Sequence, residues 1–99
     1  MASVSSVTIG GMPRISAFYG IVVWMYWDGD DHSVPHFHAR YGGVWASKAI
    51  DDLRVLAGQL PRRAQRLVFE WARLHQQEFL ANWQRARLGE PLERIARLP

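Results

Sequence analysis

The hydrophobic and polar positions of the chain follow two different spacings. In the first half, residues 14–27 (RISAFYGIVVWMYW) are rich in β-branched and aromatic residues, which favour a strand. The Asp- and Gly-rich residues 28–35 predict a turn. A second strand is predicted over residues 36–51, where a Gly-Gly pair could fold it into a hairpin, and a third, short strand over residues 54–60. The connections are too short for parallel crossovers, so the sheet is expected to be antiparallel.

After Pro61 the hydrophobic residues recur at intervals of three and four, which predicts one helix of about 25 residues. Pro61 suits the first helical position, and Gly89 followed by Pro91 is typical of a helix end. The apolar side of this helix should lie on the sheet: Ala64, Leu67, Val68, Trp71, Phe79 and Ala86. The polar side should face solvent: Arg62, Arg66, Arg73, Gln77 and Gln84. We therefore expect an α+β fold, a small antiparallel three- to four-stranded sheet packed by one long C-terminal helix.

A chain of 99 residues has room for one small domain. We expect residues 1–11, which are rich in Ser, Gly and Thr, to be a flexible extension, and residues 12–99 to form a single α+β domain. Met12 could be the native start of the protein. Near the other end, three hydrophobic residues could dock on the domain or on a partner: Leu92, Ile95 and Leu98.

The composition excludes several classes of protein. The chain has no cysteine, which excludes disulfides, thiolate metal sites and a cysteine nucleophile. The hydrophobic run in residues 18–27 is about half as long as a membrane-spanning helix, and the first residues lack the pattern of a signal peptide. These features predict a soluble, cytoplasmic protein with no membrane partner.

The charge of the chain is uneven. The formal net charge is +3, and residues 54–99 carry nine Arg against four Glu. Guanidinium groups bind phosphate well, so a nucleic-acid-binding surface is predicted on the helix, with Arg85 and Arg87 as an extension. Its main residues are Arg62, Arg63, Arg66 and Arg73. The alternative is a solvated helix face. Three aromatic residues could stack bases, although such residues more often fill a core: Tyr19, Trp24 and Trp45.

Three of the four histidines lie in the stretch DHSVPHFHAR, residues 31–40. Alternate residues of a strand point to the same side, so His36 and His38 are predicted to share one face. Two imidazoles placed in this way can ligate a divalent metal such as zinc, and His75 in the helix is the predicted third ligand. Further candidate ligands are Asp30, Asp31, His32 and Glu78. The alternative is that these histidines only stabilise the fold.

The same histidines also suggest an enzyme that needs no metal. Two histidines with pKa values near about 6.5 can serve as general base and general acid. Arg40 lies on the same predicted strand face and could stabilise a phosphorane-like transition state when RNA is cleaved through its own 2′-hydroxyl. The candidate catalytic residues of such a ribonuclease are His36, His38, His75 and Arg40. Other enzyme classes are not favoured, because the chain has no Gly-rich phosphate loop and no Gly-x-Ser-x-Gly motif.

Four segments resemble, in the same order, a family of small bacterial proteins: MPRISAFYGIVVWMYW, PHFHARYGG, LPRRAQRLVFEWARLHQQEFLANW and GEPLERI. The family is catalogued as domain of unknown function forty-one-sixty, and the resemblance runs from Met12 to about Leu98. Its Pro-His-x-His signature corresponds to Pro35, His36 and His38, whereas the acidic run before it departs from the family pattern. The resemblance brings no established activity. It implies a partner protein encoded by a neighbouring gene, in an arrangement similar to toxin–antitoxin pairs.

Protein binding is the function that these observations favour. The chain is small and rich in aromatic residues, and an open strand edge would accept a strand from another protein or from a second copy of this chain. We therefore expect one component of a toxin–antitoxin-like or regulatory gene pair that acts by binding protein, with nucleic acid as a further candidate ligand. The alternative is a small histidine-dependent ribonuclease or metal-binding enzyme that uses the His-x-His motif.

Overall fold

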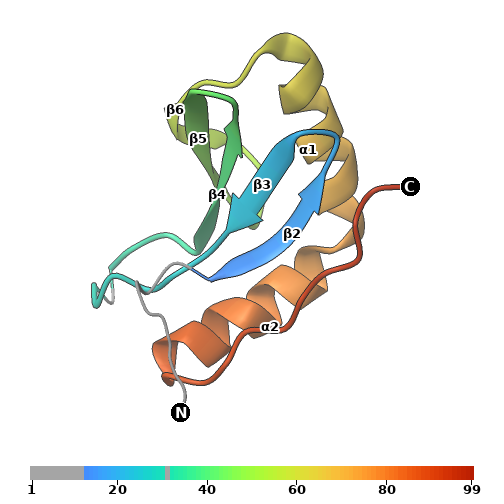
Figure 1. Ribbon diagram of the computed structural model, residues 1–99. Coiled ribbons are helices and arrows are strands. Elements are labelled where there is room, and N and C mark those ends of the chain that lie inside the picture. Colours follow the sequence, from blue (N-terminus) through green and yellow to red (C-terminus); the bar gives the residue numbers. More distant parts are fainter. Residues whose placement is uncertain (1–12, 31) are drawn as a thin grey trace.

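Five strands form one antiparallel sheet in the computed structural model, which describes residues 13–30 and 32–99 (Figure 1). Strands that follow one another in the chain are neighbours in the sheet: β2 (Arg14–Phe18), β3 (Ile21–Trp24), β4 (His36–Tyr41), β5 (Val44–Ala49) and β6 (Val55–Gly58). The predicted α+β fold with an antiparallel sheet is confirmed, but the prediction of three or four strands is wrong. The predicted extension, residues 1–11, and the predicted start at Met12 lie outside the described residues.

The larger number of strands comes from two tight turns. Residues 14–27 fold back at Tyr19 and Gly20, which both have a positive φ, of 50° and 81°. A two-residue turn with positive φ at both positions matches the twist of a β-hairpin, and glycine adopts such a φ without steric cost. Gly42, with a φ of 60°, lies in the corresponding turn between β4 and β5. The region predicted as one long strand is therefore the β2–β3 hairpin.

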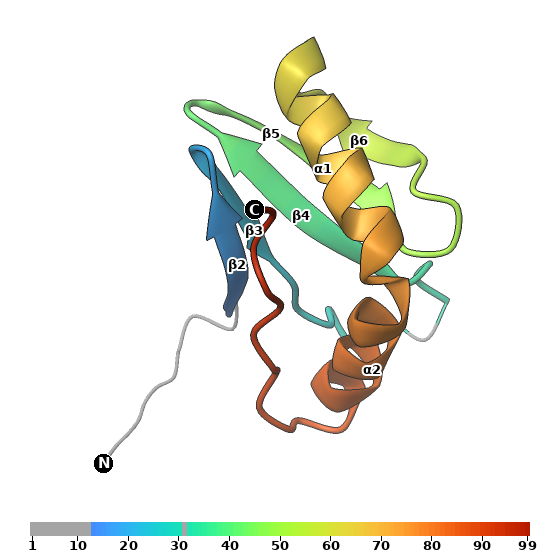
Figure 2. The same cartoon turned by 90° about the vertical axis from the view of Figure 1, so that its right-hand side faces the viewer.

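Two helices follow the sheet, α1 (Arg62–Leu74) and α2 (Gln76–Arg87), so the prediction of one long helix is wrong. His75 interrupts the helical path with a φ of −125°. A straight helix of about 25 residues would be roughly 38 Å long, whereas the longest strands here, of six residues, span only about 20 Å. The break keeps α2 against the domain where a straight helix would extend beyond it (Figure 2). Neither helix of the described part of the chain is long and apolar enough to cross a membrane.

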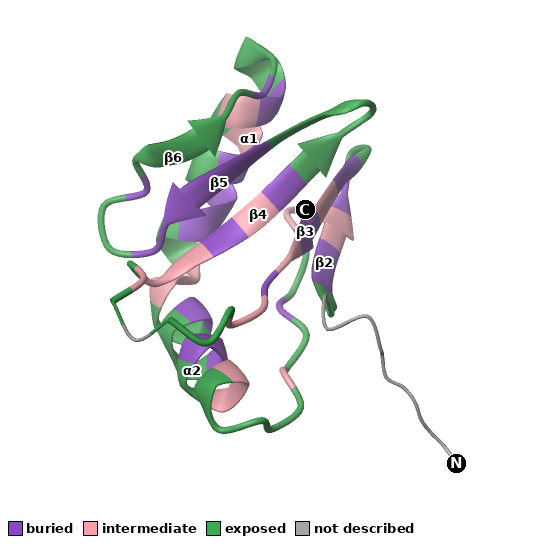
Figure 3. Cartoon of the chain, turned by 90° about the vertical axis from the view of Figure 1, so that its left-hand side faces the viewer, coloured by how far each residue is buried: buried purple, intermediate pink, exposed green. Residues whose placement is uncertain are grey.

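The helices cover one side of the sheet and leave the other side uncovered. Figure 2 shows α1 crossing the sheet, and Figure 3 shows the opposite side of the sheet, which neither helix covers. On the covered side the buried rings of Phe37 in β4 and Phe79 in α2 stack, with ring centroids 4.4 Å apart. Lys48 of β5 is also buried, with its Nζ 5.8 Å from the ring centroid of Phe69 in α1, and burial lowers the pKa of Lys48.

The C-terminal residues 90–99 run back along the domain and close the core beside β2 (Figure 2). The backbone N–H of Ile95 donates to the carbonyl oxygen of Ile15 (2.9 Å), and Nε1 of Trp71 donates to the carbonyl oxygen of Ala96 (2.7 Å). The three hydrophobic residues of this tail pack on the core: Leu92, Ile95 and Leu98. The tail therefore docks on its own domain, which is one of the two options that its sequence leaves open.

Candidate binding face

The strand register defines which side chains project from the uncovered side of the sheet. Residues directly opposite each other in an antiparallel pair share a face. Phe37 and Ala39 of β4 are fully buried in the core, so their neighbours in β4 project from the other side. We define the open face as the residues that the register places on that side: Arg14, Ala17, Val22, Trp24, His36, His38, Arg40, Trp45, Ser47, Ala49 and Ala57.

Aromatic rings gather around His38 at the middle of the open face. The ring of His38 stacks on Trp24 of β3, with centroids 5.2 Å apart and planes inclined by 15°. It also stacks on Tyr26, just after β3, with centroids 5.2 Å apart and planes inclined by 7°. Trp45 projects from the same face on β5, the strand next to β4 on the side away from β3. Its ring centroid is 6.1 Å from that of His38, and the residue is 46% exposed. We call Trp24, Tyr26, His38 and Trp45 the His38 cluster.

The His38 cluster contains two buried polar atoms without a partner. Burial of the ring, and to a smaller extent the nearby His36, lower the pKa of His38 to about 4, so the ring is neutral at pH 7. Nδ1 of His38 and Nε1 of Trp24 are buried, and neither forms a hydrogen bond to any described residue. A buried polar atom that stays unpaired costs about 1–3 kcal/mol. Two hydrogen-bonding groups of the cluster therefore have no partner among residues 13–30 and 32–99, and they lie on the side of the sheet that neither α1 nor α2 covers.

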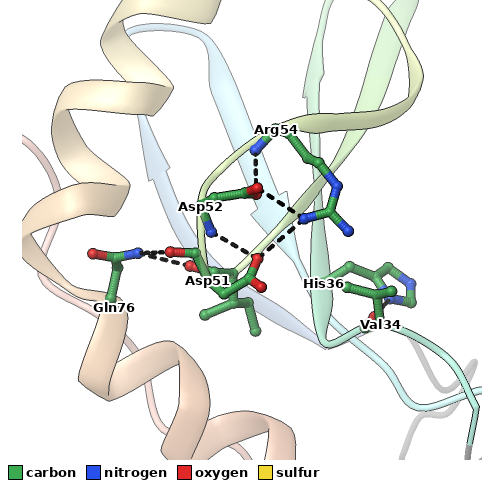
Figure 4. Close-up of polar contacts among 7 residues, drawn as sticks. Val34, His36, Asp51, Asp52, Arg54 and Gln76 are labelled. Atoms are coloured by element: carbon green, nitrogen blue, oxygen red, sulfur yellow. Dashed lines mark hydrogen bonds and ion pairs between the residues drawn. The ribbon is translucent and has the colours of Figure 1, made fainter.

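His36 lies at the end of the open face nearest α2. Its Nδ1 donates to the carbonyl oxygen of Val34 (2.7 Å), so the neutral ring keeps its proton on Nδ1 and Nε2 remains the basic nitrogen (Figure 4). The ring centroid of His36 lies 5.3 Å from that of His38 and 5.2 Å from that of Trp83 in α2. The two histidines of the His-x-His motif are therefore neighbours on one face, as the alternation of side chains in a strand predicts.

Figure 4 also shows the polar contacts that fix the turn before β6 to the helix break. Nη1 of Arg54 forms ion pairs with Asp52 (2.9 Å) and Asp51 (3.4 Å), and a backbone hydrogen bond from Arg54 lowers the pKa of Asp52. Nε2 of Gln76 donates to the carbonyl oxygens of Ile50 and Asp51 (2.8 Å each). The Arg54 ion pairs lie within the turn, and the Gln76 hydrogen bonds join the first residue of α2 to that turn.

His75 does not join the histidine pair. It lies on the helix side of the sheet, where its Nδ1 bonds a carboxylate oxygen of Glu78, while the strand directs His36 and His38 to the opposite side. Among the described residues, no three His, Asp or Glu side chains come close enough together to hold a metal ion. The predicted set of His36, His38 and His75 is therefore not assembled as one site, and the candidate ligand Asp31 lies outside the described residues.

Basic side chains form two separate surfaces. Arg14 and Arg40 project from the open face, and neither forms an ion pair with a described residue. The arginines predicted to bind nucleic acid are all exposed on α1, on the helix side of the molecule: Arg62, Arg63, Arg66 and Arg73. The sequence predicted the basic helix and named Trp24 and Trp45 as residues that could stack bases, but it did not place these rings beside Arg40 on one face.

The two edges of the sheet also differ. The edge of β2 receives a backbone hydrogen bond from the C-terminal tail, whereas no described strand pairs with the outer edge of β6. Both Val55 and Leu56 of β6 are exposed. An open strand edge of the predicted kind is therefore present in the described part of the chain, next to the strand that carries Trp45.

The place of Tyr26 beside His38 was not predicted from the sequence, and Trp24 and Trp45 were expected to fill the core more often than to be exposed. In the structure, fully buried residues alternate with partly exposed ones over residues 21–26 (IVVWMY). That period of two continues beyond the end of β3 and directs Tyr26 to the same side as Trp24. This alternation cannot be recognised in the sequence, because both sides of the hairpin carry apolar residues.

The fold and the open face define a small α+β protein whose antiparallel sheet is covered by helices on one side in the part of the chain that the structure describes. The chain belongs to the family described as Domain of unknown function (DUF4160), which matches residues 20–84, well over half of the chain. This range is shorter at both ends than the resemblance seen in the motifs, but it includes the whole His38 cluster. No curated protein and no solved structure matches the chain.

Proposed function

We propose that this protein is the binding component of a toxin–antitoxin-like or regulatory gene pair, and that it binds through the open face. The observation that carries this proposal is the His38 cluster, an aromatic group on the side of the sheet that no helix covers. Trp, Tyr and Arg residues supply most of the binding energy at protein interfaces. Arg40 and Trp45 are directly opposite each other in the β4–β5 pair, so two side chains of this kind are adjacent.

Binding at this face would remove a large aromatic surface from water. The side chain of Trp45 is 46% exposed, and each apolar Å² that a partner covers contributes about 25 cal/mol to binding. Nε1 of Trp24 and Nδ1 of His38 have no partner in the described chain, and a polar group brought to the cluster could pair with them after a small shift of the rings. Both effects favour an occupied open face over a solvated one.

The family resemblance suggests a protein encoded by a neighbouring gene as the partner. β6 lies beside β5, so a strand added at the edge of β6 would extend the sheet next to Trp45. A second copy of this chain could use the same edge. Light scattering on the purified protein separates these two cases, because only self-association gives a dimer in the absence of the neighbouring gene product.

The proposal is tested by co-expression of the tagged protein with the product of the adjacent gene. The double variant Trp45→Ala with Arg40→Ala should no longer copurify with that product, because it lacks two adjacent exposed side chains of the open face. The control carries Phe69→Ala with Arg66→Ala, a matched aromatic and arginine that are exposed on α1. Copurification with the first variant, or its loss with the control alone, would contradict the proposal.

A second candidate function is a metal-independent ribonuclease. The observation that favours it is the short distance between His36 and His38, with Arg40 further along the same side of β4. With a pKa of about 4, His38 is neutral at pH 7 and could take a proton from a 2′-hydroxyl, while a protonated His36 would give the proton on its Nε2 to the leaving 5′-oxygen. A base with so low a pKa is weak, and this makes the binding function the better supported of the two.

The nuclease hypothesis is tested by incubating unstructured RNA with the protein in the presence of a chelator. Specific cleavage that disappears in both His36→Ala and His38→Ala, and persists in His75→Ala, would support a site on the open face. The absence of cleavage by the unmodified protein, or cleavage that survives both changes, would eliminate it.

A further inference from the structure

We infer that the open face binds single-stranded RNA, with unpaired bases stacked on Trp45 and Trp24 and an intervening phosphate held by Arg40. The inference rests on the proposed function, because it names a ligand that the same face takes when the partner protein does not occupy it. It depends on three features of that face: the spacing of the rings, the charge of the surface and the side of the molecule on which the rings lie.

The spacing of the two indoles suits a strand of RNA. Trp24 lies on β3 and Trp45 on β5, and β4 with Arg40 lies between them. Neighbouring strands are about 4.8 Å apart, and successive residues on one face are about 7 Å apart along a strand. The backbone positions of the two tryptophans are therefore about 10 Å apart across the sheet and one row apart along it, and the ring of His38 lies between the two indoles. Bases that stack on the indole faces turned away from His38 would let the backbone segment between them pass over the row that holds Arg40.

The rings are able to stack. Trp45 is exposed, and its only ring neighbour among the described residues is His38, at a centroid distance of 6.1 Å and an angle of 43° that is not a parallel stack. Trp24 is already supported from one side by the stacked, neutral ring of His38. Stacking on aromatic side chains is the main sequence-tolerant contribution to single-strand binding, because every base has a π-face.

The charge of the open face complements a phosphate backbone. The face carries Arg14 and Arg40 and includes no Asp or Glu. The nearest carboxylates along the chain lie in the loops at the end of the sheet where β4 begins, whereas Arg40 and Trp45 lie towards the end where β4 finishes. Because neither arginine is paired with a described carboxylate, both can contact phosphate without breaking an ion pair.

Paired nucleic acid does not fit this surface. Bases in a duplex are stacked on one another and cannot stack on rings that stand on a sheet, so only a single strand uses the indoles. Sheets with exposed aromatic residues are one of the common means by which proteins recognise unpaired RNA. The arginines of α1 lack such a set of rings, and Phe69 is the exposed aromatic side chain among them. Binding at α1 would therefore not distinguish single-stranded from double-stranded nucleic acid.

The inference is tested with the full-length protein and a fluorescently labelled ten-nucleotide RNA of mixed sequence, by anisotropy. The same sequence is also used as an RNA duplex and as single-stranded DNA. Trp45→Ala should weaken binding of the single-stranded RNA by about tenfold or more, and Trp45→Phe, which keeps an aromatic ring, should restore most of the affinity. The matched control Phe69→Ala should leave the affinity unchanged within about twofold.

The salt dependence tests the role of Arg40. Each phosphate contact to a single strand contributes about 0.7 to the slope of log K against log salt concentration. Arg40→Gln should lower this slope by about that amount, whereas Arg66→Gln on α1 should leave it unchanged. Thermal unfolding of each variant, compared with the unmodified protein, verifies that the loss of binding does not reflect an unfolded chain.

Several outcomes would overturn the inference. These are no binding of single-stranded RNA by the unmodified protein, equal effects of Trp45→Ala and Phe69→Ala, and tighter binding of the duplex or of single-stranded DNA. The copurification experiment, repeated with the single variants Trp45→Ala and Phe69→Ala, separates this failure from that of the proposed function. If Trp45→Ala abolishes the protein complex and no RNA binds, the open face is a protein surface and only the inference is wrong. If Trp45→Ala affects neither ligand, both proposals are wrong.

Discussion

Two tryptophans on opposite sides of the sheet differ in whether their indole N–H has a hydrogen-bond partner. Nε1 of Trp71, on the covered side, donates to the carbonyl oxygen of Ala96 in the C-terminal tail (2.7 Å). Nε1 of Trp24, on the open face, is buried but has no partner among the described residues. The histidines show the same contrast, because Nδ1 of His75 bonds Glu78 whereas Nδ1 of His38 bonds no described residue.

This difference in hydrogen bonding indicates on which side of the sheet the described residues satisfy their own buried groups. On the covered side, the helices and the tail bring both the apolar contacts and the hydrogen bonds, although Gln65 of α1 leaves its buried Oε1 unpaired there. On the open face the described residues supply rings and arginines, and neither helix covers them. We therefore expect substitutions on the covered side to act mainly on stability, and those on the open face to act mainly on binding.

The sharpest test of this comparison pairs a ring from each side. Phe37→Ala removes a fully buried ring that stacks on Phe79, so it should lower the free energy of unfolding by about 3–5 kcal/mol. Trp45→Ala, on the open face, should lower it by less than about 1 kcal/mol, because almost half of that side chain is already in water. Urea denaturation followed by circular dichroism measures both values. Equal losses in the two variants would mean that the open face also maintains the fold.

A smaller effect is expected where the tail is fixed to α2. The buried side chain of Asn82 donates from Nδ2 to the carbonyl oxygen of Glu93 (2.9 Å), and its Oδ1 accepts from the backbone N–H of Glu93 (2.8 Å). Asn82→Ala leaves both backbone groups unpaired, so we expect a loss of about 3 kcal/mol in unfolding free energy. For a domain of this size the melting temperature should fall by more than about 10 °C. Gln84→Ala changes an exposed residue of the same helix and is the control. A similar fall in the melting temperature of that variant would show that the hydrogen bonds between Asn82 and Glu93 contribute little.

The sequence predicted the covered side better than the open face, and the reason is physical. The apolar stripe of the helix needs only a spacing of three and four residues to be recognised, and Ala64, Val68 and Trp71 are buried as that spacing predicts. The break at His75 was not predicted, because it is imposed by the size of the sheet and by Gln76 reaching Ile50, which is a contact between residues far apart in the chain. No local pattern records such a contact.

In the candidate site too, the features set by neighbouring residues were predicted, and those set by contacts between distant segments were not. The shared side of His36, His38 and Arg40 follows from strand alternation alone and was predicted. The expected approach of His75 depended on which side of the sheet the helix covers, and the sequence leaves that side undefined. The helix packs against the side that carries Phe37, so His75 and the histidine pair are on opposite sides.

The third test concerns the hydrogen bonds at the helix break, where Gln76 joins the start of α2 to the turn before β6. Gln76→Ala removes two hydrogen bonds to the carbonyl oxygens of Ile50 and Asp51, which should cost about 2 kcal/mol of unfolding free energy. Gln77→Ala changes an exposed neighbour of the same type and should have little effect. Chemical denaturation of the two variants is the measurement. If both behave alike, the position of α2 depends on apolar packing and the hydrogen bonds of Gln76 contribute little.

The smallest effect concerns the open face and depends on pH. The pKa of His38 is about 4 in the folded protein and about 6.5 in the unfolded chain, so the unfolded state binds a proton first as the pH falls. The stability linked to His38 is therefore complete above about pH 6.5 and is lost progressively as the pH falls towards about 4. The full shift corresponds to about 3 kcal/mol, and because the ring is only half-buried, solvent screening reduces the expected loss to about 1–2 kcal/mol.

His38→Phe isolates this contribution, because phenylalanine can occupy the same place between Trp24 and Tyr26 but cannot take up a proton. The difference in unfolding free energy between pH 7 and pH 4.5 should be smaller in this variant than in the unmodified protein by most of that amount. His32→Ala removes an exposed histidine of the preceding loop and should leave the difference unchanged. If His38→Phe keeps the full pH dependence, the ring of His38 already meets water in the folded protein. The open face would then differ from the covered side only in its apolar surface, and Nδ1 of His38 would cease to be a reason to expect a ligand there.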